Sequence, residues 1–123
     1  MTLTACGGGE EVQFANYSDQ TPVVPVWAII EAFKQNPVKA QSEYSTVEYS
    51  TEITTINIYP HATEVQSTLV DSSGLSDFVY CTMKDSEVSK LTEYNVGSTI
   101  KLSGTFESYN LFGLKFFDCT IIE

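Results

Sequence analysis

The stretch TVEYSTEITTINIY, residues 46–59, decides the fold, because its hydrophobic alternation changes phase within one extended run. Val47 and Tyr49 lie on one phase of the two-residue strand period. Ile56 and Ile58 lie on the opposite phase. A phase change inside a strand indicates a β-bulge or a sharp bend, the device by which one strand serves two sheets or turns the corner of a barrel.

Segments with regular hydrophobic periodicity come before and after this strand in the sequence. Before it, four apolar residues follow the spacing of one helix face: Val26, Ile29, Ile30 and Phe33. Pro25 suits the first helical position, Asn36-Pro37 ends the helix, and a short helical stretch follows from Val38 to Tyr44. After it, period-two patterns and turns predict four further strands: Thr63–Val70, Asp77–Lys84, Thr99–Glu107 and Leu111–Ile122.

A further helix is predicted between the third and fourth strands. Val88 and Leu91 lie three residues apart within Ser86–Tyr94, and Asp85 or Ser86 suits its N-cap. The order is therefore helix, three strands, helix, two strands, the topology of the OB-fold, a five-stranded, partly open Greek-key barrel. In that fold strand one pairs with both strand two and strand four. We expect a mainly β domain of this fold, with another small α+β barrel or roll as the alternative.

Composition limits the class of protein. The chain has 123 residues, of which 42% are hydrophobic, so a single domain with a core is expected. It carries 16 acidic residues against six lysines and no arginine, and its net charge is −10. This charge repels polyanions and disfavours a nucleic-acid partner. No run of about 18 apolar residues is present, so no membrane-spanning helix is predicted.

We expect residues 1–21 to form a lipoprotein signal remnant and flexible tether, and residues 22–123 to form the OB-fold domain. The motif LTAC, residues 3–6, resembles the end of a bacterial lipoprotein signal peptide, in which Cys6 receives the lipid. A Gly-rich run follows it, as a tether requires. Gly7 stands where an aspartate is associated with inner-membrane retention, so the resemblance implies the periplasmic face of the outer membrane. The alternative is an ordinary free thiol in a disordered N-terminus.

Short motifs within residues 22–123 also resemble a known family, the tRNA_anti-like OB-fold proteins, many of which are predicted lipoproteins. The residues that resemble its first helix, its third and fourth strands and its closing strand are Val26–Asn36, Ala40, Tyr44, Val79–Met83, Gly97–Phe106 and Phe117–Ile122. Ser50-Thr51 stand where such proteins usually carry a mid-strand glycine. The resemblance implies an OB-fold without a known activity, and the family name is poor evidence for tRNA binding.

Two cysteines lie on the predicted third and fifth strands, which run side by side and parallel in an OB-fold. Strand spacing of about 4.8 Å is within the separation that a disulfide tolerates, so Cys81 and Cys119 are expected to form a bridge or a close contact. Cys119 is expected to share the core face with Phe117 and Ile121. Such a bridge adds roughly 3 to 4 kcal/mol in the chain-entropy model. Two buried reduced cysteines are the alternative.

We expect no enzymatic activity. The only histidine, His61, lies in a tight turn, with no serine or cysteine nucleophile motif near it. Several carboxylates are more simply explained as solvated or helix-capping groups: Glu48, Glu52, Asp85 and Glu87. No Cys/His spacing resembles a zinc site and no acidic loop resembles a calcium site, so the sequence predicts no metal and no cofactor.

A binding surface is easier to support. If Val79 and Cys81 face the core, Phe78 and Tyr80 face outward on the third strand, where OB-folds present a ligand platform together with two loops. The candidate ligand-binding residues are Phe78, Tyr80, Tyr59, His61, Tyr109 and Phe112. The alternative is that the N-terminal helix or a neighbouring loop covers Phe78 and Tyr80 as a second small core.

Two functional classes remain open. In the first, which we expect, the tethered acidic domain binds a protein, peptide or glycan of the cell envelope through these aromatic residues. In the second, it binds single-stranded nucleic acid by base stacking on the same rings. Phosphate binding requires a track of lysines and arginines, which six scattered lysines do not supply.

Overall fold

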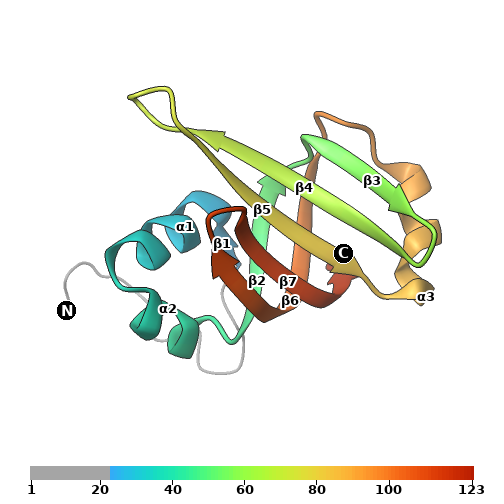
Figure 1. Ribbon diagram of the computed structural model, residues 1–123. Helices are drawn as coiled ribbons and strands as arrows, with labels where there is room; N and C mark the ends of the chain where they lie inside the picture. Colours follow the sequence, from blue (N-terminus) through green and yellow to red (C-terminus); the bar gives the residue numbers. More distant parts are fainter. Residues whose placement is uncertain (1–22) are drawn as a thin grey trace, which may run out of the picture.

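The computed structural model of the protein describes residues 23–123 (Figure 1). The lipid-attachment site expected at Cys6 and the tether expected over residues 1–21 lie outside the described residues. The strands are β1 (Val24–Pro25), β2 (Thr46–Glu52), β3 (Thr55–Tyr59), β4 (Ala62–Val70), β5 (Ser76–Met83), β6 (Thr99–Asn110) and β7 (Gly113–Ile121). The helices are α1 (Val26–Gln35), α2 (Pro37–Glu43), α3 (Asp85–Val88) and the 3-10 helix η2 (Ser89–Glu93).

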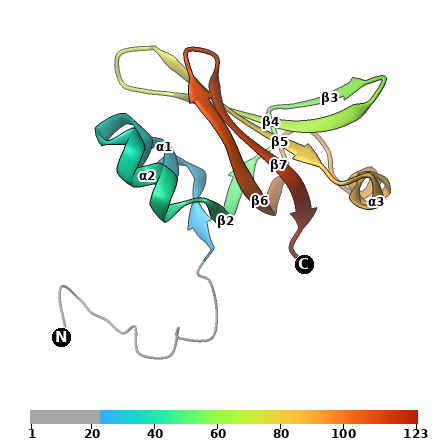
Figure 2. The ribbon, with the colours of Figure 1, turned by 60° about the horizontal axis from the view of Figure 1, so that its bottom comes forward.

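The fold is mainly β with helices, as expected. All strands of the described residues belong to one mixed sheet in the order β1-β2-β6-β7-β5-β4-β3. The helices α1 and α2 lie together at one side of the sheet, and α3 lies at the opposite side (Figures 1 and 2). The apolar face predicted for α1 is confirmed, because the helix buries Val26, Ile29, Ile30 and Phe33.

The predicted phase change over residues 46–59 lies at a break between β2 and β3. The N–H of Ile53 donates to the carbonyl of Ser98 at 2.9 Å, whereas the N–H of Thr54 donates to the carbonyl of Gln66 at 2.9 Å. The segment therefore changes partner within two residues. As a result, β2 pairs with β6 and β3 pairs with β4, both antiparallel.

The expected count of five strands is wrong. The break divides one expected strand into β2 and β3, and β1 pairs parallel with β2 through only two residues. The sheet therefore has seven strands, and α3 and η2 lie between β5 and β6, the fifth and sixth strands along the chain. A two-residue strand shows no periodicity, so the sequence pattern contained no signal for β1.

Strand β7 contains a bulge at Asp118, a non-glycine residue with a φ of 58°. Phe116 pairs with Cys81 of β5 and Cys119 pairs with Met83, so an advance of three residues along β7 matches an advance of two along β5. Phe116 is therefore buried together with Cys119, and Phe117 points outward with 41% exposure. The expectation that Phe117 shares the core face with Cys119 is wrong, because one extra left-handed residue shifts the phase of the strand.

A disulfide between Cys81 and Cys119 ties β5 to β7, with a Cα–Cα distance of 6.0 Å. Gly104 of β6 leaves room for it. A Cβ built on this glycine would stand 2.9 Å from Cys119 Sγ and 2.9 Å from Phe116 Cβ. Both distances are shorter than van der Waals contact, so a side chain at this position forces its neighbours to move.

Gly104→Ala is expected to lower the free energy of unfolding by about 1 to 3 kcal/mol, because the added methyl overpacks the core against the disulfide. With Cys81 and Cys119 both replaced by alanine, the cost should become smaller, because only the Phe116 contact remains. Urea unfolding of the four proteins measures this coupling. An equal cost in both backgrounds would show that the disulfide does not restrict this position.

Candidate functional site

Two aromatic rings lie on the face of β5 that points away from the core. Val79 and Cys81 are fully buried, so the alternation of the strand turns Phe78 and Tyr80 to the other side, where both are partly exposed. Their ring centroids lie 6.4 Å apart and the ring planes are inclined by 24°. The two rings are therefore nearly parallel neighbours on one surface.

Polar side chains of β3 and β4 lie beside these rings. The Asn57 Nδ2 group donates to Glu64 Oε1 at 3.0 Å and to Gln66 Oε1 at 3.1 Å. Gln66 lies opposite Tyr80 in the register of β4 and β5. We call this surface the β3–β5 face, and it consists of Asn57, Glu64, Gln66, Thr68, Phe78 and Tyr80.

Glu64 is enclosed although it lies outside the core, since only 6% of it is exposed. Burial, and after it the charge of Glu64 and the neighbouring Tyr59, raise the pKa of Tyr80 above the ordinary value of 10.0. The hydroxyl of Tyr80 therefore stays protonated at neutral pH and can donate a hydrogen bond. The β3–β5 face thus surrounds two rings with amide, carboxylate and hydroxyl groups.

Glu64→Gln is expected to lower the pKa of Tyr80 and still leave it above the ordinary value, because the charge disappears while burial, the larger cause, remains. NMR titration of the tyrosine ring carbons measures the change. Glu48→Gln removes the same charge from β2 and should leave Tyr80 unaffected. A Tyr80 pKa that responds equally to both substitutions would disprove the specific proximity of Glu64.

Positive charge is scarce on this surface. Strands β3, β4 and β5 contain no lysine or arginine. Lys115 of β7 lies opposite Tyr80 in the sheet register. Lys34 of α1 stands at the far end of β5, where its Nζ lies 2.8 Å from Asp77 Oδ2 and 3.9 Å from Asp71 Oδ2. The charge of Lys34 is therefore already paired with carboxylates.

Two of the predicted site residues, Tyr59 and His61, lie at the turn between β3 and β4. Tyr59 is 52% exposed at the end of β3, and His61 is exposed in the turn itself. Both line an open hollow of about 500 Å³ that Asp85 and Val88 of α3 also line. Tyr59 follows Asn57 by two residues on β3, so both lie on the same side of the strand and this hollow adjoins the β3–β5 face.

The structure places Tyr109 and Phe112 in different surroundings. Tyr109 lies on β6 and packs against Phe33 of α1, with ring centroids 5.1 Å apart. Phe112 lies in the turn between β6 and β7 and is 78% exposed. A small cavity of about 50 Å³ brings Tyr109 near Phe78, with Ile30 of α1 on its wall. Helix α1 therefore approaches the Phe78 end of the β3–β5 face.

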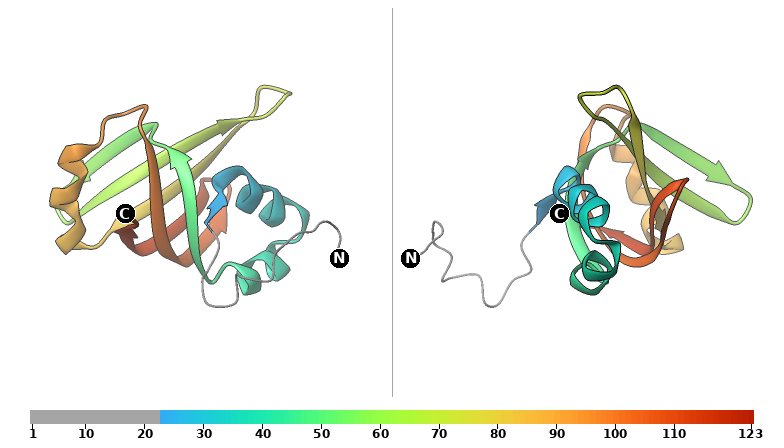
Figure 3. Two further views of the ribbon diagram at one scale, coloured as in Figure 1. Left: turned by 180° about the vertical axis from the view of Figure 1, so that it is seen from behind. Right: turned by 60° about the vertical axis from the view of Figure 1, so that its left-hand side comes forward.

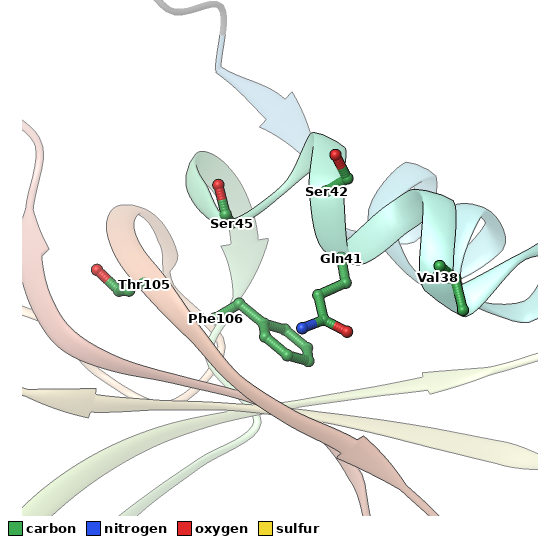
Figure 4. A pocket seen from close by; sticks show the side chains of 6 residues that line it. All are labelled: Val38, Gln41, Ser42, Ser45, Thr105 and Phe106. Carbon is green, nitrogen blue, oxygen red and sulfur yellow. The ribbon is translucent and has the colours of Figure 1, made fainter.

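A second open hollow lies between α2 and β6 and was not predicted from the sequence (Figure 4). Its volume is about 500 Å³, and its lining residues are Val38, Gln41, Ser42, Ser45, Thr105 and Phe106. The Gln41 amide extends from α2 beside the ring of Phe106. That ring stacks on Phe33 with centroids 5.5 Å apart. None of the lining side chains titrates near neutral pH, so the hollow offers groups for binding rather than for acid–base catalysis.

The only feature of the sequence that relates to this hollow is Val38, an apolar residue on α2. The structure leaves this residue 79% exposed. A helix of seven residues is too short for one exposed valine to stand out from its pattern.

One carboxylate of the predicted capping turn has a structural role. Glu87 accepts the N–H of Ile121 at 2.8 Å and lies 3.0 Å from Lys90 Nζ, and these contacts lower its pKa. Within residues 23–123, no group of three or more His, Cys, Asp or Glu side chains is arranged to hold a metal ion. In the same part of the chain, no helix is long and apolar enough to cross a membrane.

Comparison with known proteins shows structural likeness without sequence likeness. No protein-family model and no curated protein matches the chain. The structure is similar to that of a proposed nucleic acid-binding lipoprotein from Klebsiella pneumoniae subsp. pneumoniae, with a TM-score of 0.63 and 13% identity over 91% of this chain and 100% of that chain. It also resembles the Stn1–Ten1 complex of S. pombe, with a TM-score of 0.43 and 17% identity over 63% of this chain and 58% of that chain. The first likeness shows a shared fold.

Proposed function

We propose that this chain is a non-enzymatic binding module that holds a protein, peptide or glycan of the bacterial cell envelope on its β3–β5 face. The observation that carries the proposal is a pair of nearly parallel rings, 6.4 Å apart, beside the network formed by Asn57, Glu64 and Gln66. Rings of this kind cover apolar ligand surface, while amides and carboxylates bind hydroxyl and N–H groups and set orientation.

The charge of the face favours this ligand class over nucleic acid. Binding of a phosphate backbone requires several lysines or arginines along its path. The three strands of the face supply none, and the chain has a net charge of −10. An uncharged glycan or a peptide without acidic clusters meets no such repulsion.

We further propose that the fold is an OB-type barrel, related to the tRNA_anti-like proteins. In this assignment β2 and β3 are the two halves of strand one, and β4, β5, β6 and β7 are strands two to five. The pairing of β2 with β6 and of β3 with β4 supports it, since strand one of an OB-fold pairs with strands four and two. The β3–β5 face then corresponds to the usual ligand platform.

We also propose that Cys6 carries a lipid and that the domain lies at the periplasmic face of the outer membrane. The similar solved structure is that of a lipoprotein. The disulfide between Cys81 and Cys119 supports an oxidising compartment, where such bridges persist.

Labelled palmitate is expected to enter the protein in bacterial cells that express the gene with its upstream region, and Cys6→Ala should abolish the labelling. Cys81→Ala serves as the control, because this cysteine is buried and bridged. Equal labelling of the natural protein and Cys6→Ala, or no labelling of either, would rule out the lipid anchor.

A second candidate function is binding of single-stranded nucleic acid. The observation that favours it is the similar fold of a lipoprotein proposed to bind nucleic acid. Bases would stack on Phe78 and Tyr80, and Lys115 would be the nearest cation on the paired strand.

Phe78→Ala and Tyr80→Ala are each expected to weaken binding of an envelope glycan or peptide about tenfold or more, because both rings lie on the proposed contact surface. Phe112→Ala removes an equally large ring from the turn between β6 and β7 and should leave binding unchanged. Screening of envelope glycan and peptide panels, followed by calorimetric titration of the four proteins, tests this.

The same variants distinguish the second candidate. Oligonucleotide binding at micromolar concentration that weakens steeply with added salt, and that the Tyr80→Ala variant loses, would replace the first proposal by the second. Ligand binding that is equally lost in Phe112→Ala would place the site away from the β3–β5 face.

A further inference from the structure

Strand β3 forms an edge of the sheet. Among the residues that the structure describes, β3 pairs with β4 alone and ends the strand order. Because alternate N–H and C=O groups of a strand point to opposite sides, half of those of β3 point away from β4. Figure 3 shows the hairpin of β3 and β4 standing out from the rest of the molecule. An edge of this kind can accept a further strand.

This edge lacks the charged residues that often prevent pairing. No residue from Ile53 to Thr63 is charged, although the chain contains 16 acidic residues and six lysines. No proline or bulge interrupts β3, and its residues include two isoleucines and a tyrosine, which favour extended pairing. Ile58 is 81% exposed. An uncharged edge with an exposed isoleucine therefore indicates a partner strand.

We propose that the partner is a second copy of this chain, and that two β3 strands pair antiparallel across a twofold axis at Asn57. In this register Ile56 faces Ile58 of the other copy. Thr55 likewise faces Tyr59 of the other copy. Apolar pairs and aromatic pairs with β-branched residues stabilise antiparallel strands, and the twofold axis forms each pair twice. The strand TINIY is thus complementary to itself.

Charge favours self-association through this edge over association through other parts of the surface. Two copies with a net charge of −10 each repel one another, and the repulsion is smallest where uncharged segments meet. Pairing through β3 breaks no ion pair found in the structure, because none of the ion-paired residues lies on β3. The dimer is therefore expected to become more stable with added salt, since salt screens only the repulsion.

The dimer continues the sheet from one copy to the other. Asn57 lies on β3 and also belongs to the β3–β5 face, so the two faces adjoin across the axis. A repetitive ligand, such as a glycan chain or an extended peptide, then contacts two sites at once and gains affinity by avidity. This consequence for the ligand depends on the proposed function, whereas the dimer itself does not.

Sedimentation equilibrium of the 123-residue chain at low and high salt tests the proposal. The natural protein is expected to be dimeric, with a lower dissociation constant at high salt. Ile58→Lys should be monomeric, because a charge then faces the other strand. Leu111→Lys makes the same change at a residue that is 99% exposed in the turn between β6 and β7, and it should remain dimeric. Circular dichroism should show both variants folded, because both positions are exposed.

A cross-link tests the register. In a Cys6→Ser background, Asn57→Cys is expected to form a disulfide between two copies, because residues paired across antiparallel strands have Cα atoms about 4.5 to 5.5 Å apart. Leu111→Cys should not form one at the same concentration. Three results would overturn the proposal: a natural chain that stays monomeric at high concentration, an Ile58→Lys variant that still dimerises, or a dimer that Asn57→Cys does not cross-link.

Discussion

The backbone of Ile53 and Thr54 sends its hydrogen bonds to two different parts of the sheet, and the rest of the fold depends on this division. The first N–H bonds to Ser98, just before β6, and the second bonds to Gln66 of β4. These two residues therefore join β2 to β3, and these two strands lie near opposite ends of the strand order. The strands between them have to connect these ends, so the sheet curls and encloses one core.

A cluster of close contacts holds the middle of this curled sheet. The left-handed Asp118 adds one residue to β7, which turns both Phe116 and Cys119 inward, and Gly104 on β6 leaves the space that they occupy. The disulfide to Cys81 then ties β7 to β5. Because β5 also carries Phe78 and Tyr80 on its other side, the constraint that stabilises the core holds the candidate ligand surface in place.

The start of β7 fixes the other end of this surface. Gly113 has a φ of 128°, and a Cβ at this residue would collide with the backbone carbonyl of Phe78. The close approach of the two strands is possible only without a side chain, so glycine is required there for two reasons. Phe78 thereby lies close to Gly113 of β7, and it lines a small cavity together with Ile30 of α1. Tyr80 lies opposite Gln66 of β4. The two rings of the candidate site thus have different neighbours.

The sequence by itself determined the local elements. Helix α1 with its buried face, the phase change within residues 46–59, and the outward direction of Phe78 and Tyr80 all follow from periods of 3.6 or 2 residues, which depend only on neighbours along the chain. Tertiary structure decided the features that hydrophobic periodicity does not predict. A left-handed Asp118 reversed the phase of β7 and exposed Phe117, Tyr109 packed on Phe33, and the hollow between α2 and β6 arose from segments far apart in the chain. Each of these features depends on contacts between distant segments, and no local pattern records such contacts.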